Sequence, residues 1–363
     1  MEPWKDGVVG SADIRDILYR AIASGASDIL IVSGGPLCFK MNGRVVPQEE
    51  RKLSPEDTEA MIRRIYEFSG GRDIRPLMEC GDDDFSFSIS GLGRFRCNAY
   101  KQRGSLSAVL RAVAFTLPDA SALNIPDAVL DLCDRQKGLV LVTGPAGSGK
   151  STTLACMIDR INHSRNGHVI TLEDPIEYLH AHNRCIVSQR EIAQDTEGYD
   201  SALRAALRQA PDVILLGEMR DFETIRTVIT AAETGQLVLS TLHTVGAAKT
   251  IDRIIDVFPP SQQQQIRVQL SMVLQAVVSQ QLIPTVDGRL TPAFEIMTVT
   301  PAVRTMIRES KVYQIDNVLY AGADQGMRTM DGDLLRLFRE GEIAREHALA
   351  FSTNPEAMEK KMG

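Results

Sequence analysis

Hydrophobic and polar positions near the start of the chain change from a helical to a strand-like spacing. Apolar residues recur every three to four positions over 14–22, which predicts an amphipathic helix. The apolar run at 28–33 then predicts a short buried strand. Asn42-Gly43 is a dipeptide typical of tight turns, so we expect the strands beside it to form a hairpin.

A second helix and further strands follow in the same region. Ser54-Pro55 predicts an N-cap and a first helical turn, in a helix that continues towards Phe68. Apolar and polar residues alternate at 85–89 and again at 95–99, which predicts two strands with one buried face each. We therefore expect residues 1–117 to form a mixed α+β domain.

The pattern changes after Lys137 to apolar runs separated by helical stretches, such as the apolar stripe within 225–232. Strands and helices that alternate in this way predict an α/β domain with a parallel sheet. We assign residues 118–134 to a linker and 135–363 to this second domain, with mostly helices after Val245. The expected strands are 138–143, 168–172, 212–217 and 236–242.

Length and composition are those of a folded protein with more than one domain. The 363 residues are 44% hydrophobic and 24% charged, and they suffice for about two domains. The net charge of −7 argues against general binding to a nucleic-acid backbone, so we expect no nucleic-acid partner. Six scattered cysteines fit neither a zinc ribbon nor a disulfide framework.

The sequence also bears on location. Residues 1–10 are mixed polar and contain no apolar core of signal-peptide length, and no apolar run reaches the roughly 18 residues that span a bilayer. We expect a cytoplasmic protein that associates with the inner face of a membrane only through partners.

One motif carries specific chemistry. The apolar run 138–143 leads into GPAGSGKS, which begins at Gly144, and then into a helical stretch, as a P-loop requires. Backbone N–H groups of such a loop surround phosphates, the lysine reaches the β and γ oxygens, and the serine hydroxyl binds Mg²⁺. The candidate nucleotide-binding residues are Gly144, Gly147, Ser148, Gly149, Lys150, Ser151 and Thr152.

Polar residues follow three other expected strands, at the edge where open α/β sheets bind ligands. Glu173, Asp174 and Glu177 follow one strand, and one of them could polarise an attacking water; a solvated acidic turn is the alternative. Glu218 follows another strand, as a Mg²⁺-binding acid does in such folds, or it simply starts a helix. His243 follows a third, either to sense the γ-phosphate or as a structural histidine.

Three arginines form a candidate basic face in the first domain. Arg94 and Arg96 alternate with Phe95, and Arg111 lies in another alternating segment. Arginines can complete a nucleotide site at an interface between domains or subunits. The alternative is a solvated strand face.

Four ordered motifs resemble the secretion ATPases of type II and type IV systems, in particular the members that retract pili. Nearly the whole chain takes part, including SGASDILI and NGRVVP in the first domain and 301–309 near the C-terminus. The resemblance implies a PAS-like N-terminal domain and a RecA-like P-loop ATPase domain with a helical C-terminal extension. The four motifs are GPAGSGKSTTL (144–154), ITLEDPIEYLH (170–180), ILLGEMRDFETI (214–225) and STLHTVGAAKTIDRIIDVFP (240–259).

The same resemblance implies roles and partners. It makes Glu177 the catalytic base, Glu218 the Walker B acid that holds Mg²⁺ with Ser151, and His243 the His-box histidine. The implied activity is hydrolysis of ATP with Mg²⁺ by a homo-oligomer, a hexamer by family analogy, that drives pilus retraction. An inner-membrane pilus platform protein and a paralogous retraction ATPase are the expected partners.

Two alternatives and two departures accompany this interpretation. The chain could instead serve a type II or type IV secretion or conjugation apparatus, or it could be an ATP-loaded regulatory subunit that hydrolyses little. Gln236 stands where these ATPases usually have a second His-box histidine, which puts the fine tuning of phosphate sensing in question. Ala210 stands where they commonly have an acidic residue before Pro211. We expect 301–309 to transmit force, with Arg304 and Arg308 presenting charge for docking.

Overall fold

The computed structural model describes residues 13–41, 43–113 and 117–363. The chain divides into two compact units, residues 1–115 and 116–363, which are described separately here. The expectations for residues 1–10 and for Asn42 lie outside the described residues.

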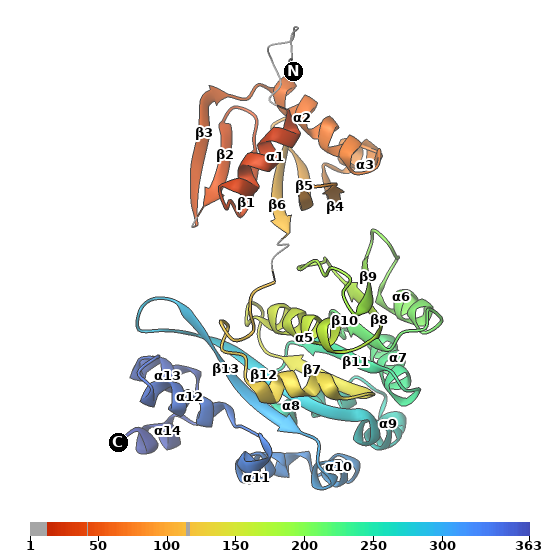
Figure 1. Ribbon diagram of the computed structural model, residues 1–363, viewed down its shortest axis with the longest axis vertical. Helices are drawn as coiled ribbons and strands as arrows, with labels where there is room; N and C mark the ends of the chain where they lie inside the picture. The colour runs from red at the N-terminus through yellow and green to blue at the C-terminus, as the bar shows by residue number, and fades with distance from the viewer. Residues whose placement is uncertain (1–12, 42, 114–116) are drawn as a thin grey trace. The chain divides into compact units, whose positions relative to one another are not determined.

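The first unit is a mixed α+β fold, as predicted. Its described strands form an antiparallel six-stranded sheet in the order β3-β2-β1-β6-β5-β4 (Figure 1). Its helices are α1 (Ile14–Ala23), α2 (Pro55–Phe68) and α3 (Arg75–Cys80). Its strands are β1 (Asp28–Ile31), β2 (Pro36–Met41), β3 (Arg44–Lys52), β4 (Asp82–Ile89), β5 (Gly93–Gln102) and β6 (Ser105–Val113).

The start of α2 follows directly from its sequence. The Ser54 side chain accepts a hydrogen bond from the backbone N–H of Asp57, and the Asp57 side chain accepts one from the Ser54 N–H. This capping box satisfies two N–H groups that the helix itself leaves unpaired. The apolar face of α2, with Ile62 and Ile65 fully buried, joins the core of the unit.

The second unit is built on a seven-stranded sheet in the order β13-β12-β7-β11-β10-β8-β9. All neighbours are parallel except the β12–β13 pair. Its strands are β7 (Gly138–Thr143), β8 (Gly167–Glu173), β9 (Cys185–Glu191), β10 (Val213–Leu216), β11 (Leu237–Leu242), β12 (Leu274–Pro284) and β13 (Leu290–Thr298).

Helices cover both faces of this sheet because its central strands are apolar on both sides. Val140 and Val142 of β7 pack with α5 (Lys150–Ser164) and α4 (Asp127–Leu130). Leu139 and Leu141 face the other way. They belong to the core formed with α6 (Tyr199–Ala206), α7 (Phe222–Glu233), α8 (Ala247–Asp256) and α9 (Pro260–Val273).

Two predictions for the second unit were incomplete. Most residues after Val245 are helical, as expected, but the sequence did not predict β12 and β13, which extend the main sheet. Both strands are long and mostly buried, and β12 pairs directly with β7, the strand that leads into the P-loop. Residues 118–134 are more than a linker, since they contain α4 and a short 3₁₀ helix, η1 (Asp131–Asp134). Val129 and Leu132 there are buried in the second unit's core.

The C-terminal region is helical beyond β13. It contains a small core of its own, in which Leu334 and Met358 pack against Ile283 of β12. Its elements are α10 (Pro301–Arg308), η2 (Val312–Gln314), α11 (Ile315–Ala321), η3 (Ala323–Gln325), α12 (Met330–Arg339), α13 (Arg345–Phe351) and α14 (Pro355–Met362).

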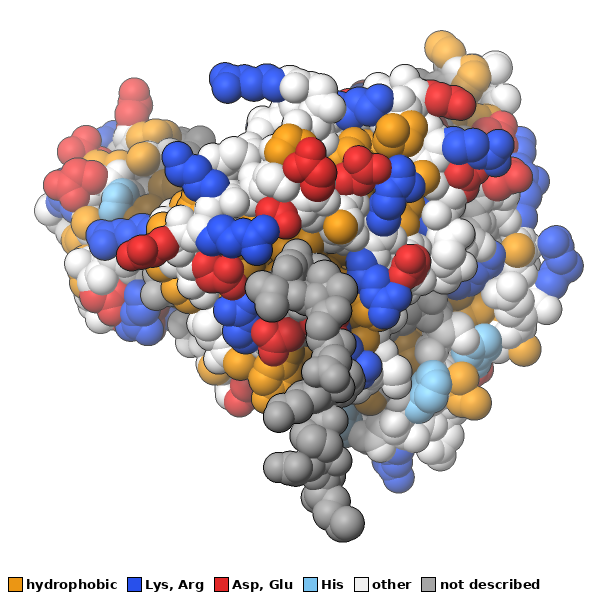
Figure 2. Space-filling view, turned by 90° about the horizontal axis from the view of Figure 1, so that it is seen from above, with side chains coloured by type: hydrophobic (Ala, Val, Ile, Leu, Met, Phe, Trp, Pro, Cys, Tyr) orange, Lys and Arg blue, Asp and Glu red, His pale blue; other side chains and the backbone are white. Residues whose placement is uncertain are grey.

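The surface mixes charges of both signs. Figure 2 shows basic and acidic side chains interspersed over the face in view. Among residues 13–41, 43–113 and 117–363, no helix combines the length and apolarity needed to cross a bilayer.

Arg304 of α10 has a structural role that the sequence did not reveal. Its Nη1 donates hydrogen bonds to the backbone oxygens of Ser271 (2.6 Å) and Met272 (2.8 Å), at the C-terminal end of α9. The guanidinium therefore satisfies carbonyl groups that the end of a helix leaves unpaired. Arg308 is exposed, and its Nη2 donates to the Thr305 hydroxyl of its own helix at 3.5 Å.

We predict that Arg304→Ala lowers the free energy of unfolding by about 1–2 kcal/mol, because it leaves the end of α9 without its charged donor. Arg308→Ala is the matched control and should change it by less than about 0.5 kcal/mol. Urea denaturation followed by circular dichroism measures both. Equal losses in the two variants would show that the α9 contact does not matter.

Candidate active site

The P-loop joins β7 to α5, as the sequence predicted. It is held to the sheet because the Gly144 N–H donates to the Leu242 oxygen of the neighbouring strand at 3.2 Å. Gly144 has a φ of 143°, and a Cβ at this position would lie 2.1 Å from the Gln280 oxygen of β12. Only glycine fits so close to another backbone.

Lys150 lies in the first turn of α5 and is 8% exposed. Its Nζ donates to the backbone oxygens of Gly144 and Pro145, each at 2.9 Å, so the ammonium lies over the loop. Burial lowers the pKa of Lys150, an effect that the nearby charge of Glu218 partly offsets. An ammonium placed inside a phosphate-binding loop is ready to exchange these carbonyls for phosphate oxygens.

The register of the parallel strands brings the other motifs to the same edge. Thr143 of β7 is level with Leu242 of β11, and Leu216 of β10 is level with both Ser240 and Leu172. The segments that follow these strand ends line a cavity of about 250 Å³ next to the P-loop. Its polar lining includes Lys150, Ser151, Glu173, Asp174, Glu177, Tyr178, His180, Glu218, Thr241 and His243.

The three acidic residues at the end of β8 and directly after it differ in environment. Glu173 accepts hydrogen bonds from the Thr171 hydroxyl (2.6 Å) and from Gln189 Nε2 (3.3 Å). Burial raises the pKa of Glu173, although these donors and the N–H of Glu177 act in the opposite direction. Asp174 and Glu177 are exposed on the cavity. Glu173 is therefore suited to shaping this loop, while the other two remain accessible to solvent and ligand.

Glu218 is held between two basic side chains. Arg220 forms an ion pair with its Oε1, and His243 Nε2 lies 3.3 Å from its Oε2. Burial alone would raise the pKa of Glu218, but the hydrogen bonds and charges of Arg220 and His243 outweigh it and lower the pKa. Arg220 also lies 3.8 Å from Asp174. The site thus holds an ionised carboxylate opposite Lys150 and Ser151.

The predicted nucleotide-binding residues fall into two groups. Gly147, Lys150 and Ser151 line the cavity with Glu177, Glu218 and His243. The others, Gly144, Ser148, Gly149 and Thr152, shape the loop or face its far side. Thr152 Oγ1 lies within hydrogen-bonding distance of the Tyr178 hydroxyl, at 2.9 Å.

Sequence reasoning missed Gln280 of β12, which is 3% exposed behind the P-loop. Its Oε1 accepts a hydrogen bond from the Thr153 hydroxyl at 2.7 Å. Gln280 is the middle one of three consecutive polar residues at 279–281, and its place behind the P-loop becomes readable only once this stretch is known to be a strand beside β7.

A second cavity, of about 290 Å³, adjoins the first helical turn of α5 at Gly149 and Thr152. Apolar side chains form much of its wall, and Gln280 adds an amide. The apolar lining includes Leu123, Ile125, Leu282, Leu290 and Pro292.

Gln236 and His243 occupy opposite ends of β11. Gln236 directly precedes the strand, and its side chain accepts a hydrogen bond from the Thr234 hydroxyl at 2.8 Å. Strands of this length span roughly 20 Å, so Gln236 does not share the cavity that His243 lines. The concern that Gln236 alters phosphate sensing therefore does not hold within one chain.

The three candidate arginines lie in the first unit. Arg96 of β5 is opposite Arg111 of β6 in the antiparallel register, and Arg94 is two residues before Arg96. Arg111 forms an ion pair of 2.8 Å with Asp28, whose side chain is 7% exposed, whereas Arg96 is exposed. The structure thus brings Arg96 and Arg111 together on one sheet and gives Arg111 a structural contact.

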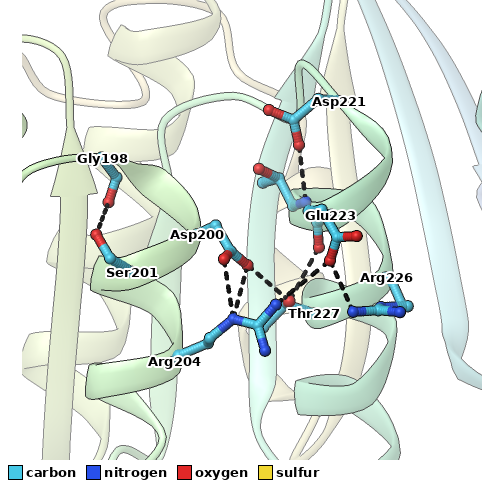
Figure 3. A network of polar contacts seen from close by, with 9 residues as sticks. Gly198, Asp200, Ser201, Arg204, Asp221, Glu223, Arg226 and Thr227 are labelled. Carbon is cyan, nitrogen blue, oxygen red and sulfur yellow. Dashed lines mark hydrogen bonds and ion pairs between the residues drawn. The ribbon is translucent and has the colours of Figure 1, made fainter.

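A polar network supports the helices that flank the Glu218 segment (Figure 3). Arg204 of α6 is bonded to Asp200 of its own helix and reaches Glu223 of α7 at 3.3 Å. Glu223 also pairs with Arg226, and the Thr227 hydroxyl donates to Asp200. These contacts tie α7, which begins just after the Glu218 loop, to α6.

Comparison with known proteins supports the class of site. The family model described as Type II/IV secretion system protein matches residues 5–325. The type IV pilus retraction ATPase PilT of Pseudomonas aeruginosa is 43% identical over 95% of this chain and 99% of its own. A twitching motility protein of Neisseria gonorrhoeae is 48% identical over 76% of this chain and 74% of its own.

Solved structures agree. The crystal structure of the pilus retraction motor PilT with bound ADP has a TM-score of 0.89 and 44% identity, and the match covers 96% of this chain and 100% of that one. The Legionella pneumophila ATPase DotB has a TM-score of 0.80 and 29% identity over 95% and 96%. The chain belongs to the Type II/IV secretion system protein family, and the predicted resemblance and fold class are confirmed.

His180, which lines the cavity, predicts a pH dependence of stability. Burial lowers the pKa of His180 to about 4. Between pH 6.5 and pH 4 this histidine is therefore mainly protonated in the unfolded chain and mainly neutral in the folded chain. The free energy of unfolding falls as the pH decreases through this range. We predict that His180→Gln removes up to about 3 kcal/mol of this acid-dependent loss.

Urea denaturation at pH 7.5 and at pH 4.5 measures the effect. The measurement at pH 7.5 is an internal control, because the folded and unfolded histidines are both mainly neutral there. An equal decrease in the parent and in His180→Gln between the two pH values would contradict the assignment.

Proposed function

We propose that the chain is the ATP-hydrolysing subunit of a motor that retracts type IV pili. The observation that carries this proposal is the single cavity onto which the P-loop and the ends of β8, β10 and β11 open. Its PilT relatives, one of them solved with bound ADP, support ATP as the nucleotide.

The lining residues suit a nucleotide phosphate chain and Mg²⁺. The P-loop N–H groups and Lys150 would hold the β and γ phosphates. Ser151 and the ionised Glu218 offer the hard oxygen donors that Mg²⁺ prefers, and they line the same cavity. Bound there, Mg²⁺ would neutralise part of the phosphate charge. His243, 3.3 Å from Glu218, would respond to changes in charge at this carboxylate.

Glu177 is the acid that we assign as the general base. Glu173 is engaged by Thr171 and Gln189, and Asp174 lies near Arg220, so both have protein partners. Glu177 is exposed and lines the cavity, which leaves its carboxylate available to accept a proton from water.

The second cavity is suited to the adenine base of the nucleotide. It lies beside Gly149 and Thr152, on the far side of the loop from the carboxylates. Its apolar wall would bury the faces of a purine, as nucleotide pockets commonly do. Gln280 would offer an amide to the edge of the base.

Assembly and location are further parts of the proposal. A homo-oligomeric ring, a hexamer in the version we favour, would place each subunit where force can be exchanged with its neighbours. An inner-membrane pilus platform protein would hold the ring at the cytoplasmic face of the membrane. The 40% identity to the type IV pilus ATPase PilU of Pseudomonas aeruginosa supports a paralogous retraction ATPase as a partner.

Two alternatives make different predictions. A secretion ATPase has support from a putative type II secretion system protein E of Escherichia coli, but at 34% identity over 67% of this chain, against 43% over 95% for PilT. A regulatory subunit that binds ATP without turnover would not need an accessible acid at Glu177. Hydrolysis by the purified protein separates the regulatory subunit from both motors.

We predict that Glu177→Gln keeps ATP binding and lowers kcat at least about 100-fold, because the amide keeps the shape of the side chain and cannot accept the proton. Fluorescent nucleotide binding and phosphate release under saturating MgATP measure the two effects. Glu197→Gln, an exposed acid outside the cavity, is the control. Parent-like turnover of Glu177→Gln would refute its role as the base.

We also predict that Lys150→Ala abolishes measurable nucleotide binding, since its ammonium lies inside the P-loop and no other lysine lines the cavity in the described residues. Lys137→Ala is the control, because Lys137 is exposed and precedes the opposite end of β7. Unchanged affinity in Lys150→Ala, measured by isothermal titration, would place the nucleotide elsewhere.

The arginines yield a separate prediction. If Arg96 completes the site in the ring, Arg96→Ala lowers kcat by up to about 1,000-fold and leaves the unfolding free energy nearly unchanged. Arg111→Ala should instead cost about 1 kcal/mol of stability, because Asp28 loses its partner. Steady-state ATPase assays and urea denaturation distinguish the two. A parent-like rate for Arg96→Ala would show that Arg96 belongs only to a solvated strand face and takes no part in hydrolysis.

A further inference from the structure

The segment after β11 leads from the cavity to α8. His243 lines the cavity, and α8 begins four residues later at Ala247. Two side chains hold the end of this segment from neighbouring strands. The Gly246 N–H donates to Ser279 Oγ of β12 at 2.9 Å, and the Ala247 N–H donates to Glu295 Oε1 of β13 at 2.8 Å.

Glu295 has a second backbone partner. It is only 8% exposed, and the N–H of Met330 also lies close enough to act on its carboxylate. Burial raises the pKa of Glu295, while the N–H groups of Ala247 and Met330 act against this. Met330 is the first residue of α12, so one carboxylate lies between the N-terminal ends of α8 and α12. Both ends carry the partial positive charge that favours a carboxylate.

The segment at the start of α12 is otherwise fixed to the same strand. Ile296 and Arg328 exchange backbone hydrogen bonds of 2.8 and 3.0 Å, and the Phe294 N–H donates to Asp333 of α12 at 2.8 Å. Asp333 is fully buried. A displacement of β13 at Glu295 therefore moves the beginning of α12 with it.

The cavity supplies a reason for movement. His243 touches the Glu218 carboxylate, which carries the charge that Mg²⁺ and nucleotide phosphates would meet. A change of charge there would alter the position of His243, and the segment 243–246 would carry that change to α8.

We propose that Glu295 is a positioning residue that couples the His243 segment to the C-terminal helical region through α12. The inference rests on the proposed function, because it needs nucleotide at the cavity. It assigns force transfer to a buried carboxylate at the junction of two helices, in addition to any role of α10.

Hydrogen exchange measured by mass spectrometry tests the coupling in the full-length protein. The probe is ADP with Mg²⁺ and beryllium fluoride, which mimics the γ-phosphate. In the parent we expect the probe to slow exchange in 144–152 and 243–247, and to change exchange in 327–335 at least about twofold. In Glu295→Gln, whose amide has one acceptor oxygen in place of two, we expect the first two responses to persist and the third to disappear.

Two further variants separate coupling from loss of structure. Thr329→Ala removes the hydroxyl that accepts a hydrogen bond from Gly332 at the start of α12, and it does not touch α8. It should raise the basal exchange of α12 and still show the response to the probe. Glu295→Asp, which is one methylene shorter, should lose the response as Glu295→Gln does, so the test survives if one variant fails to fold.

The outcomes are distinct. Loss of the 327–335 response in the Glu295 variants alone supports the inference. A parent protein that responds at 144–152 and 243–247 but not at 327–335 overturns it and leaves the proposed function standing, as does an unchanged response in the Glu295 variants. A parent with no response at 144–152 overturns the proposed function and this inference together.

Discussion

The parallel register of β8, β10, β11 and β7 is the constraint on which the rest of the second unit depends. Once Thr143, Leu172, Leu216 and Leu242 are held at the same edge, the backbone that follows each strand must enter the same space. The strands themselves are almost fully buried, so this register is maintained by apolar packing on both faces. Residues that lie far apart in the sequence, such as Thr143 and Leu242, thereby become neighbours.

Lys150 and Glu218, which carry opposite charges at this edge, each have protein partners before any ligand arrives. Lys150 is bonded to P-loop carbonyls, and Glu218 is paired with Arg220 and His243. A buried ion without partners would cost several kcal/mol, and these contacts avoid that cost. Nucleotide binding would then exchange one set of partners for another, which keeps the change in free energy small and the site reversible.

Local patterns were sufficient to predict much of this arrangement. The P-loop could be found because its glycine spacing is tied to a specific backbone path, and the central strands because they are short, continuous apolar runs. The N-cap at Ser54 was readable for the same reason, since the residues involved are adjacent in the sequence. In the first unit, alternation revealed the segments that form β4 and β5.

What the sequence could not reveal depends on distant contacts. The runs at 274–284 and 290–298 have no alternation that distinguishes a strand from a buried helix, and only pairing with β7 decides the matter. Gln280 and Glu295 lie on those strands, so their contacts with Thr153 and Ala247 could not be anticipated. Arg304 was expected to present charge for docking, but the nearby end of α9 gives it a structural contact.

A structure of the full-length protein with Mg²⁺, ADP and beryllium fluoride would test the account most directly. The account predicts phosphates enclosed by the P-loop and Lys150, the metal bound by Ser151 and close to Glu218, and a water within hydrogen-bonding distance of Glu177 opposite the γ position. A nucleotide bound away from the P-loop, or a different acid holding that water, would contradict it.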